Sequence, residues 1–123
     1  MTLFHRIKIP FLKEFRESML SEKKTKTSRT KRYGKPGDTF EAFEAVFELT
    51  DVQEKALVTV AHLYYKEEGF ENKEDFIACW EKLHPKKGYV PNLLVWLHSF
   101  RKVATLYYTK EFLSKRKKRE SEK

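Results

Sequence analysis

The sequence predicts an α+β domain, most simply a small curled sheet with helices packed at its ends. Segments whose apolar residues alternate with period two are interleaved with segments whose apolar residues recur at helical spacing. The chain has 123 residues, which favours one domain. Its hydrophobic fraction of 40%, with 10 Phe, 6 Tyr and 2 Trp, is enough for a core at this size.

The N-terminal part predicts a strand, a helix and a second strand. Phe4 to Ile9 alternates loosely, as a short strand does. Pro10 suits a first helical position, and apolar residues recur at helical spacing through Phe11 to Leu20, which predicts an amphipathic helix. A strand is expected around Lys26 to Thr30, and a turn at Gly34 to Asp38.

The central segment, Thr39 to Thr50, is rich in Phe and Val and changes phase once. The slip lies between Ala42 and Phe43, and one residue of shift exchanges the two faces of a strand. The pattern therefore predicts either two strands or one strand with a bulge. Asp51 to Leu57 is ambiguous.

Two helices are expected next. Val58 to Glu68 has helical spacing, and Gly69 suits the left-handed residue that closes a helix. Asn72 is the expected N-cap of a second helix, which Pro85 ends. The apolar stripe predicted for this second helix consists of Phe76, Trp80, Leu83 and His84.

The C-terminal part predicts a buried strand at Leu93 to Phe100. Val103 to Tyr108 is either a last strand or the start of a C-terminal helix. We expect one domain over residues 1–113 and a basic, disordered tail over 114–123, because the tail lacks apolar residues to bury.

The chain is basic, with 26 Lys and Arg against 18 Asp and Glu and a formal net charge of +8. Part of the excess lies in residues 22–35 and part in Lys115 to Arg119. This pattern favours a polyanionic partner, nucleic acid ahead of an acidic membrane surface.

Several function classes are excluded or disfavoured. The single cysteine, Cys79, allows no intrachain disulfide and no cysteine-rich zinc site, and it is interpreted as a packing residue. No glycine-rich phosphate loop and no Ser-His-Asp pattern is present, so we expect neither a cofactor nor a metal. No apolar run resembles a signal peptide or a membrane span, so we expect a cytoplasmic monomer. No metal-ligand spacing connects His5, His62, His84 and His98.

The stretch from Glu22 to Asp38 carries the most unusual pattern. In an extended strand, side chains alternate between faces, and here both faces carry cations and hydroxyls. Such a strand has no apolar face for a core, and it suits an anionic or strongly hydrogen-bonding ligand. The alternative is a solvated basic loop.

Glu67 and Glu68 lie at the end of the predicted helix, where the helix dipole disfavours negative charge. A local rule broken without compensation indicates a functional site. The alternative is an exposed Glu68 that pairs with Lys66 or Lys73.

Lys24 and Thr27 are three residues apart, so they do not share a face of a regular strand. They can converge at the entrance of the strand, where the chain is still turning. A lysine beside a carboxylate and a threonine hydroxyl fits an activated-nucleophile set. Tyrosines at 64, 65, 107 and 108 are either base-stacking residues or residues of the core edge.

The run E-K-K-T-K-T-S-R at residues 22–29 resembles the G-x-K-x-x-T-x-R signature of the ASCH domain family. Lys24, Thr27 and Arg29 match the signature, whereas Glu22 stands where the family usually has glycine. The G-D turn ending at residue 38, the E-G step at 68–69, the helix end at 80–85 and residues 95–100 resemble later family blocks. The resemblance covers residues 8 to 103.

This resemblance implies a fold similar to the PUA domain: a small β-barrel of five to six strands, flanked by helices, with a cleft at the signature. It also implies that the protein binds RNA or a nucleotide, with Arg29 holding the ligand. We expect the neighbouring basic residues Lys26, Lys31 and Arg32 to contribute to this binding.

Some bacterial members of the family are small amidohydrolases that remove the acetyl group of N4-acetylcytidine with a lysine, a threonine and a glutamate. The resemblance assigns these catalytic roles to Lys24, Thr27 and Glu68. In this hypothesis Glu68 depresses the pKa of Lys24 or shares its proton, and the neutral amine or a lysine-activated Thr27 attacks the acetyl carbonyl. A ribonuclease and an adaptor with a vestigial cleft are the remaining alternatives.

Overall fold

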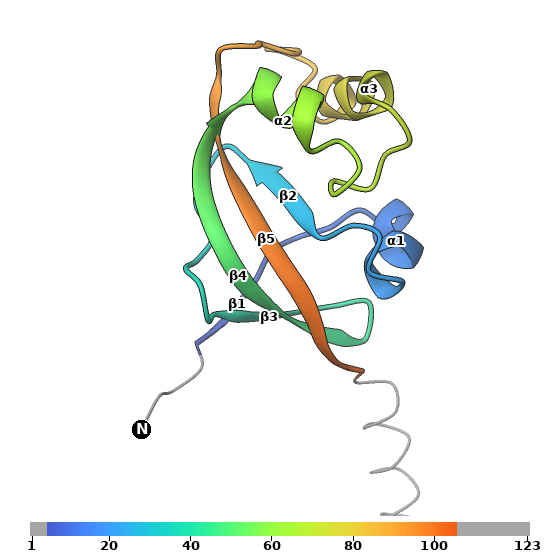
Figure 1. Cartoon of the computed structure of the whole chain (residues 1–123), viewed down its shortest axis with the longest axis vertical. Coiled ribbons are helices and arrows are strands. Elements are labelled where there is room, and N and C mark those ends of the chain that lie inside the picture. The colour runs from blue at the N-terminus through green and yellow to red at the C-terminus, as the bar shows by residue number, and fades with distance from the viewer. Residues whose placement is uncertain (1–4, 106–123) are drawn as a thin grey trace, which may run out of the picture.

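The computed structural model describes residues 5–105. Figure 1 shows two long, curved strands with the helices on one side of them. In chain order the elements are β1 (Arg6–Ile7), the 3-10 helix η1 (Lys13–Phe15), α1 (Arg16–Leu20), β2 (Lys26–Arg29), β3 (Thr39–Ala42), β4 (Ala45–Ala56), α2 (Leu57–Leu63), α3 (Lys73–Leu83) and β5 (Leu94–Thr105).

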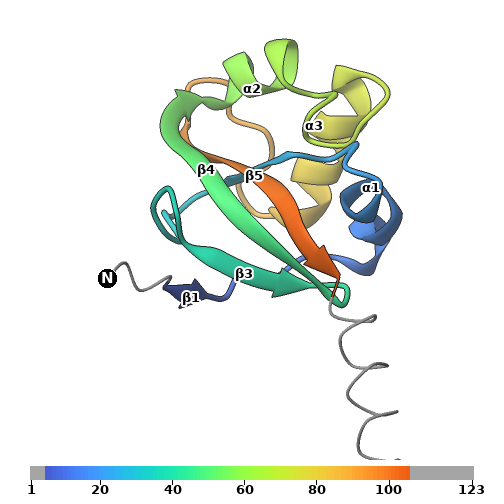
Figure 2. The same ribbon diagram turned by 60° about the horizontal axis from the view of Figure 1, so that its bottom comes forward.

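One five-stranded mixed sheet runs in the order β1-β3-β4-β5-β2. Among the strands of residues 5–105, only the β1–β3 pair is parallel. The β4–β5 ladder shifts register between Val46 and Phe47 and between Leu49 and Asp51, and such irregularities bend and twist a sheet. Figures 1 and 2 show the sheet curled around the helices, which lie on its concave side. The α+β class and the five strands are confirmed.

Strands β1 and β2 are the two edges of the curled sheet, the edges that would pair in a closed barrel. Within residues 5–105 no backbone ladder joins them. The side chain of Arg29, from β2, reaches across and donates from Nη2 to the carbonyl oxygen of Pro10, just after β1, at 2.7 Å. A side chain therefore connects the two edges, where a closed barrel would have backbone hydrogen bonds.

The phase change at Ala42 and Phe43 is a hairpin between β3 and β4, which confirms the prediction of two strands. Phe43 and Glu44 both have positive φ, 51° and 61°, as the two central residues of a type I′ turn require. β4 then continues through the ambiguous segment to Ala56.

The predicted helix over Val58 to Glu68 is wrong at its end, because α2 ends at Leu63. Residues after it turn away and approach β2, where the backbone N–H groups of Thr25 and Lys26 both donate to the Glu67 carbonyl, at 2.7 and 2.9 Å. These long-range hydrogen bonds hold the segment after α2 beside β2. Glu68 consequently lies in a turn and not at a helix end.

Other elements agree with the sequence more closely. The Asn72 side chain caps α3 by accepting the N–H of Asp75 at 2.8 Å. Of the predicted stripe on α3, Phe76 and Trp80 are buried, whereas Leu83 is exposed. The strand predicted at Leu93 to Phe100 is part of the longer β5.

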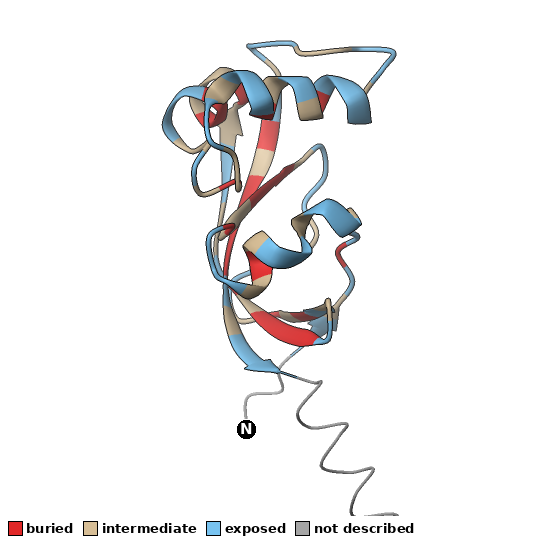
Figure 3. Ribbon diagram, turned by 90° about the vertical axis from the view of Figure 1, so that its right-hand side faces the viewer, coloured by how far each residue is buried: buried red, intermediate tan, exposed pale blue. Residues whose placement is uncertain are grey.

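Two hydrophobic clusters hold the fold together. The first centres on stacked and edge-to-face contacts among Phe40, Phe47 and Phe100, under the sheet and beside α1. The second joins α2 and α3 to the start of β5 through residues such as Val60 and Trp80. Figure 3 shows buried residues along the strands, flanked by partly buried helix positions. The space between the two clusters is where the signature strand β2 lies.

Within residues 5–105, no helix has the length and apolar character needed to cross a membrane. The expected boundary between residues 1–113 and the tail 114–123 lies outside the described residues, as do Tyr107 and Tyr108.

Candidate functional site

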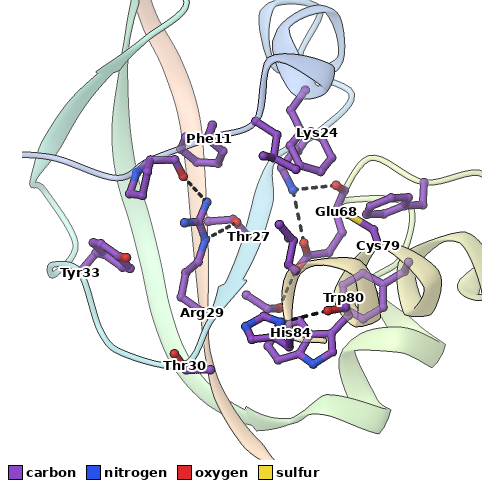
Figure 4. A pocket seen from close by; sticks show the side chains of 17 residues that line it. Phe11, Lys24, Thr27, Arg29, Thr30, Tyr33, Glu68, Cys79, Trp80 and His84 are labelled. Atoms are coloured by element: carbon purple, nitrogen blue, oxygen red, sulfur yellow. Dashed lines mark hydrogen bonds and ion pairs between the residues drawn. The ribbon is translucent and has the colours of Figure 1, made fainter. Parts of the chain in front are cut away.

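A cavity of about 370 Å³ lies between the segment after β1, strand β2 and helix α3. Figure 4 shows Arg29 and Thr27 at one side of it and Lys24 and Glu68 at the other. All four residues line the cavity, so residues from the signature and from the turn after α2 meet in one place. The remaining lining residues are Pro10, Phe11, Leu12, Phe15, Ser28, Thr30, Tyr33, Phe70, Phe76, Cys79, Trp80, Leu83 and His84.

Lys24 is almost completely buried, with 2% of its surface exposed. Its Nζ donates to the carbonyl oxygen of Lys26 at 2.9 Å, to the carbonyl oxygen of Glu68 at 2.7 Å and to Glu68 Oε1 at 3.3 Å. Three acceptors match the three N–H groups of an ammonium. The Phe15 ring lies 4.4 Å from the same nitrogen. The solvated-loop alternative for this stretch is therefore wrong at Lys24.

Burial lowers the pKa of Lys24 from its ordinary value of 10.5, because a desolvated ammonium is disfavoured. The carboxylate of Glu68 opposes this shift by charge attraction and by its hydrogen bond, and the positive charge of Arg29 adds to it. The expectation that Glu68 depresses the pKa of Lys24 is thus wrong in sign. Desolvation has that role, and Glu68 favours the protonated lysine.

Glu68 is also buried, at 3% exposed, and both of its carboxylate oxygens have partners. Oε1 accepts from Lys24, and Oε2 accepts from the hydroxyl of Ser28 at 2.5 Å. The alternative of an exposed Glu68 paired with Lys66 or Lys73 is wrong.

Gly69 makes room for the Lys24 side chain. Its φ is +100°, and a Cβ added there would lie 3.2 Å from Cβ of Lys24. Both residues of the E-G step therefore contribute to the site, because Glu68 pairs with Lys24 and Gly69 leaves space for the Lys24 side chain.

Thr27 and Arg29 lie on β2, two residues apart, and interact with one another. Arg29 Nε donates to Thr27 Oγ1 at 3.1 Å. The guanidinium also lies 4.8 Å from the Phe11 ring and 5.7 Å from the Tyr33 ring. Burial lowers the pKa of Arg29 from its ordinary value.

The other basic residues predicted to bind ligand lie outside the cavity lining. Lys26 Nζ donates to Ser99 Oγ at 2.6 Å and approaches the Tyr64 ring. Lys31 and Arg32 are exposed in the loop after β2. Arg32 Nε donates to the Gly34 carbonyl at 2.7 Å, and its guanidinium lies over Trp96.

Sequence reasoning missed two polar contributors to the site. Ser28 is four residues from Lys24, on the same parity of the strand, and that shared parity was the available signal. Trp80 was predicted only as an apolar residue, but it lines the cavity, is 5% exposed, and its Nε1 has no hydrogen-bond partner within residues 5–105. The His84 ring stacks on Trp80 with centroids 4.1 Å apart.

The residues after β1 complete the wall with apolar and aromatic side chains, Phe11 among them. Cys79, interpreted as a packing residue, is half-buried and lines the cavity, and burial raises the pKa of its thiol. No group of three or more His, Cys, Asp or Glu side chains within residues 5–105 is arranged to hold a metal ion.

No protein-family model and no curated protein matches the sequence. Solved structures do match. They include protein EF3133 from Enterococcus faecalis V583, of family DUF984, with 17% identity over 85% of this chain and 84% of that chain and a TM-score of 0.61. The hypothetical protein PH0355 is 13% identical over 80% of this chain and 99% of that one, with a TM-score of 0.62.

An ASCH domain from Lactobacillus crispatus JV V101 is 13% identical to the chain. It covers 81% of this chain and 80% of that chain, with a TM-score of 0.58. At these identities the likeness concerns the fold, which was predicted from the signature and its following blocks. The chain has the fold of an ASCH domain.

Proposed function

We propose that this protein binds RNA by taking one base of a single strand into the cavity beside β2. The observation that supports this best is the composition of the cavity wall, where aromatic rings of Phe11, Tyr33 and Trp80 surround buried polar groups. Bases stack on aromatic rings, and their edges form hydrogen bonds with such groups. A volume of about 370 Å³ is within the range of small-ligand pockets.

The charge around the cavity supports a phosphate-bearing ligand. Lys31 and Arg32 are exposed residues of the loop after β2, next to the cavity residue Thr30. The whole chain carries a formal charge of +8. Exposed lysine and arginine contact phosphates without reading the sequence and make affinity depend on salt.

The test is the salt dependence of binding to a short fluorescent single-stranded RNA, measured by anisotropy. We expect log affinity to fall with log salt, and the slope to decrease by about one for each of Lys31→Gln and Arg32→Gln that loses a phosphate contact. Arg101→Gln is the matched control, because Arg101 is an exposed cation outside the cavity that pairs with Glu48. Phe11→Leu should weaken binding by about 1–3 kcal/mol through lost stacking, at an unchanged slope. Absence of binding, or a salt-independent affinity, would refute the proposal.

A second candidate function, hydrolysis of the amide of N4-acetylcytidine, is favoured by the contact between Lys24 and Glu68 in the cavity that Thr27 also lines. Burial shifts Lys24 towards the neutral amine that a general base requires. Arg29 Nε, hydrogen-bonded to Thr27 Oγ1, would stabilise negative charge that develops on that oxygen.

In this candidate reaction the Thr27 oxygen bonds to the acetyl carbon while its proton passes to neutral Lys24. The tetrahedral intermediate then breaks its C–N bond, and the Lys24 ammonium returns the proton to the departing amine of cytidine. Water hydrolyses the acetyl-threonine ester in the same way, which gives acetate and regenerates the hydroxyl. Glu68 contributes by holding Lys24 in place.

Incubation with N4-acetylcytidine and detection of cytidine by chromatography tests this second candidate. Turnover should be lost in Lys24→Met and in Thr27→Val. It should be kept in Lys26→Met, which removes the neighbouring lysine whose side chain lies outside the cavity lining. If the wild-type protein has no turnover, or if Lys24→Met is as active as the wild type, the hydrolase hypothesis fails and base binding stands alone.

A further inference from the structure

Arg29 differs from the other cation in the cavity by lacking a carboxylate. Lys24 pairs with Glu68, and both oxygens of that carboxylate already have partners. Within residues 5–105 Arg29 forms no ion pair. Its hydrogen bonds go to the Thr27 hydroxyl and the Pro10 carbonyl, and the Tyr33 side chain and the more distant Glu68 carboxylate also favour its charge. The cavity therefore has two cations and one carboxylate among its lining residues.

A guanidinium carries five N–H donors. Arg29 uses Nε–H for Thr27 Oγ1, at 3.1 Å, and one Nη2–H for the carbonyl oxygen of Pro10, at 2.7 Å. These two bonds leave the other N–H groups, at the Nη1 and Nη2 end, for the Tyr33 side chain, which also interacts with Arg29, and for a ligand. That end is the fork that binds two oxygens of one anion side by side.

The surroundings hold this fork in a fixed orientation. The rings of Phe11 and Tyr33 lie 4.8 and 5.7 Å from the guanidinium carbon. Arg29 is partly buried, and burial disfavours its charge, whereas Tyr33 and the Glu68 carboxylate favour it. Because Arg29 has no carboxylate in direct contact, a bound anion would stabilise its charge further.

Thr27 adds a second donor at the same place. Its oxygen accepts the hydrogen bond from Arg29 Nε, so its own hydroxyl hydrogen is directed elsewhere. Because Thr27 also lines the cavity, a ligand oxygen held by Arg29 lies within reach of this hydroxyl. We infer that Arg29 and Thr27 form an oxyanion-binding corner of the cavity, which receives two oxygens of a carboxylate or phosphate group of the ligand.

This inference rests on the proposed function and specifies the chemistry of the ligand at one corner of the same cavity. The shared chemistry is a pair of oxygens that carry one negative charge. It has two sources: a phosphate of the bound nucleotide, or the carboxylate released when an amide is hydrolysed. The test therefore uses each small anion alone, without RNA or nucleoside.

The full chain, labelled with nitrogen-15, is titrated at low ionic strength with sodium acetate, sodium phosphate and acetamide, and the backbone amide signals of Thr27 and Arg29 are followed by NMR. Acetamide has nearly the shape of acetate and no charge. Ligands this small bind weakly, so affinities in roughly the millimolar range are expected. At least one anion should bind about tenfold or more tightly than acetamide, because charge-assisted bidentate hydrogen bonds are the stronger kind.

Arg29→Lys keeps the charge and removes the fork, and Arg29→Met removes both. We expect the affinity for the anion to fall in both variants, about tenfold or more in Arg29→Met. Arg101→Met is the matched control, since Arg101 is exposed, pairs with Glu48 and lies outside the cavity lining. The comparison of acetate with acetamide on the wild-type protein needs no variant, so it stands even if Arg29→Met does not fold.

Binding of acetate alone identifies a carboxylate corner, binding of phosphate alone identifies a phosphate corner, and binding of both identifies a general oxyanion site. Equal binding of acetate and acetamide with no phosphate binding, or no shift at either amide with any anion, overturns the inference. A negative anion titration would not contradict RNA binding or turnover of N4-acetylcytidine, which are measured separately. Conversely, absence of RNA binding or of turnover would not contradict a positive anion titration.

Discussion

Replacing Glu68 by Gln tests how the buried Lys24 ammonium is stabilised. The substitution keeps the shape of the side chain and an oxygen that can accept from Lys24, and it removes the charge. The amide NH2 takes the place of the oxygen that accepts from Ser28, so that hydrogen bond must reverse its direction. The two backbone acceptors of Lys24, the carbonyls of residues 26 and 68, remain in place. The change in the free energy of unfolding therefore reports the ion pair together with the Ser28 contact, and the double-variant cycle isolates the coupling with Lys24.

The magnitude follows from burial. Lys24 and Glu68 are 2% and 3% exposed, and removing one partner of such a buried pair costs about 3–5 kcal/mol. Lys24 can instead give up its proton. From the ordinary pKa of 10.5, this costs about 5 kcal/mol at pH 7 and about 2 kcal/mol at pH 9. Deprotonation therefore limits the loss, and the limit becomes smaller as the pH rises.

The sign of the pH dependence follows from proton counting. A folded-state pKa below the unfolded value means that the unfolded chain binds more protons between the two pKa values. Stability consequently rises with pH in that window, up to 10.5. Glu68→Gln lowers the folded-state pKa of Lys24 further and widens the window, so the variant should be about 3–5 kcal/mol less stable at pH 7 and about 2 kcal/mol less stable at pH 9.

The assay is urea unfolding of the wild type, Glu68→Gln, Lys24→Met and the double variant, at both pH values. The double-variant cycle should give a coupling energy of at least about 2 kcal/mol. The same cycle on Arg101 and Glu48 is the control, because that pair has a 2.8 Å contact but the arginine is 65% exposed. Its coupling should stay below about 1 kcal/mol. A Lys24–Glu68 coupling no larger than that of the exposed pair would refute this account of the site.

Two further predictions concern stability. Burial lowers the pKa of His98, whose Nε2 accepts the N–H of Tyr33 at 3.0 Å. As the pH falls, His98 is therefore protonated at a higher pH in the unfolded chain than in the folded protein. Unfolding free energy should therefore fall as the pH drops below 6.5, by up to about 1.4 kcal/mol per pH unit. His98→Gln should flatten that slope, whereas a variant of the exposed His62 should keep it, and an unaltered slope in His98→Gln would contradict the assignment. Glu22 has φ of 63° where the ASCH signature has glycine. Glu22→Gly should raise the free energy of unfolding by about 0.5–1 kcal/mol. The left-handed conformation costs about 1–2 kcal/mol for residues other than glycine, but glycine loses more conformational entropy on folding, which offsets part of the gain. Ser21→Gly, at φ of −84°, should instead be destabilising in the same thermal or urea measurement, and equal effects of both changes would refute the explanation.

Local structure was largely predictable, since it depends on neighbours in sequence. The slip at residues 42–43 predicted the hairpin between β3 and β4, and Asn72 predicted the start of α3. The signature predicted the ASCH fold, which the solved structures support. Glu22, which stands where the signature has glycine, adopts a positive φ of 63°.

The site was only partly predictable. Lys24, Thr27 and Arg29 were found together because they are close in sequence and match the signature. The partners of Lys26 were not predicted, since they depend on the register that places Lys26 opposite Ser99 of β5.

By itself the sequence determined the order of elements, the α+β class and the residues that the signature strand presents. The resemblance assigned Lys24 and Glu68 to one site, and tertiary structure decided that these residues, 44 apart in sequence, are both buried and in direct contact. Tertiary structure also decided that α2 ends at Leu63 and that the following segment lies beside β2, where Thr25 and Lys26 donate to the Glu67 carbonyl. These outcomes depend on contacts between distant segments, whose free energy exceeds the small local preference for one more helical turn.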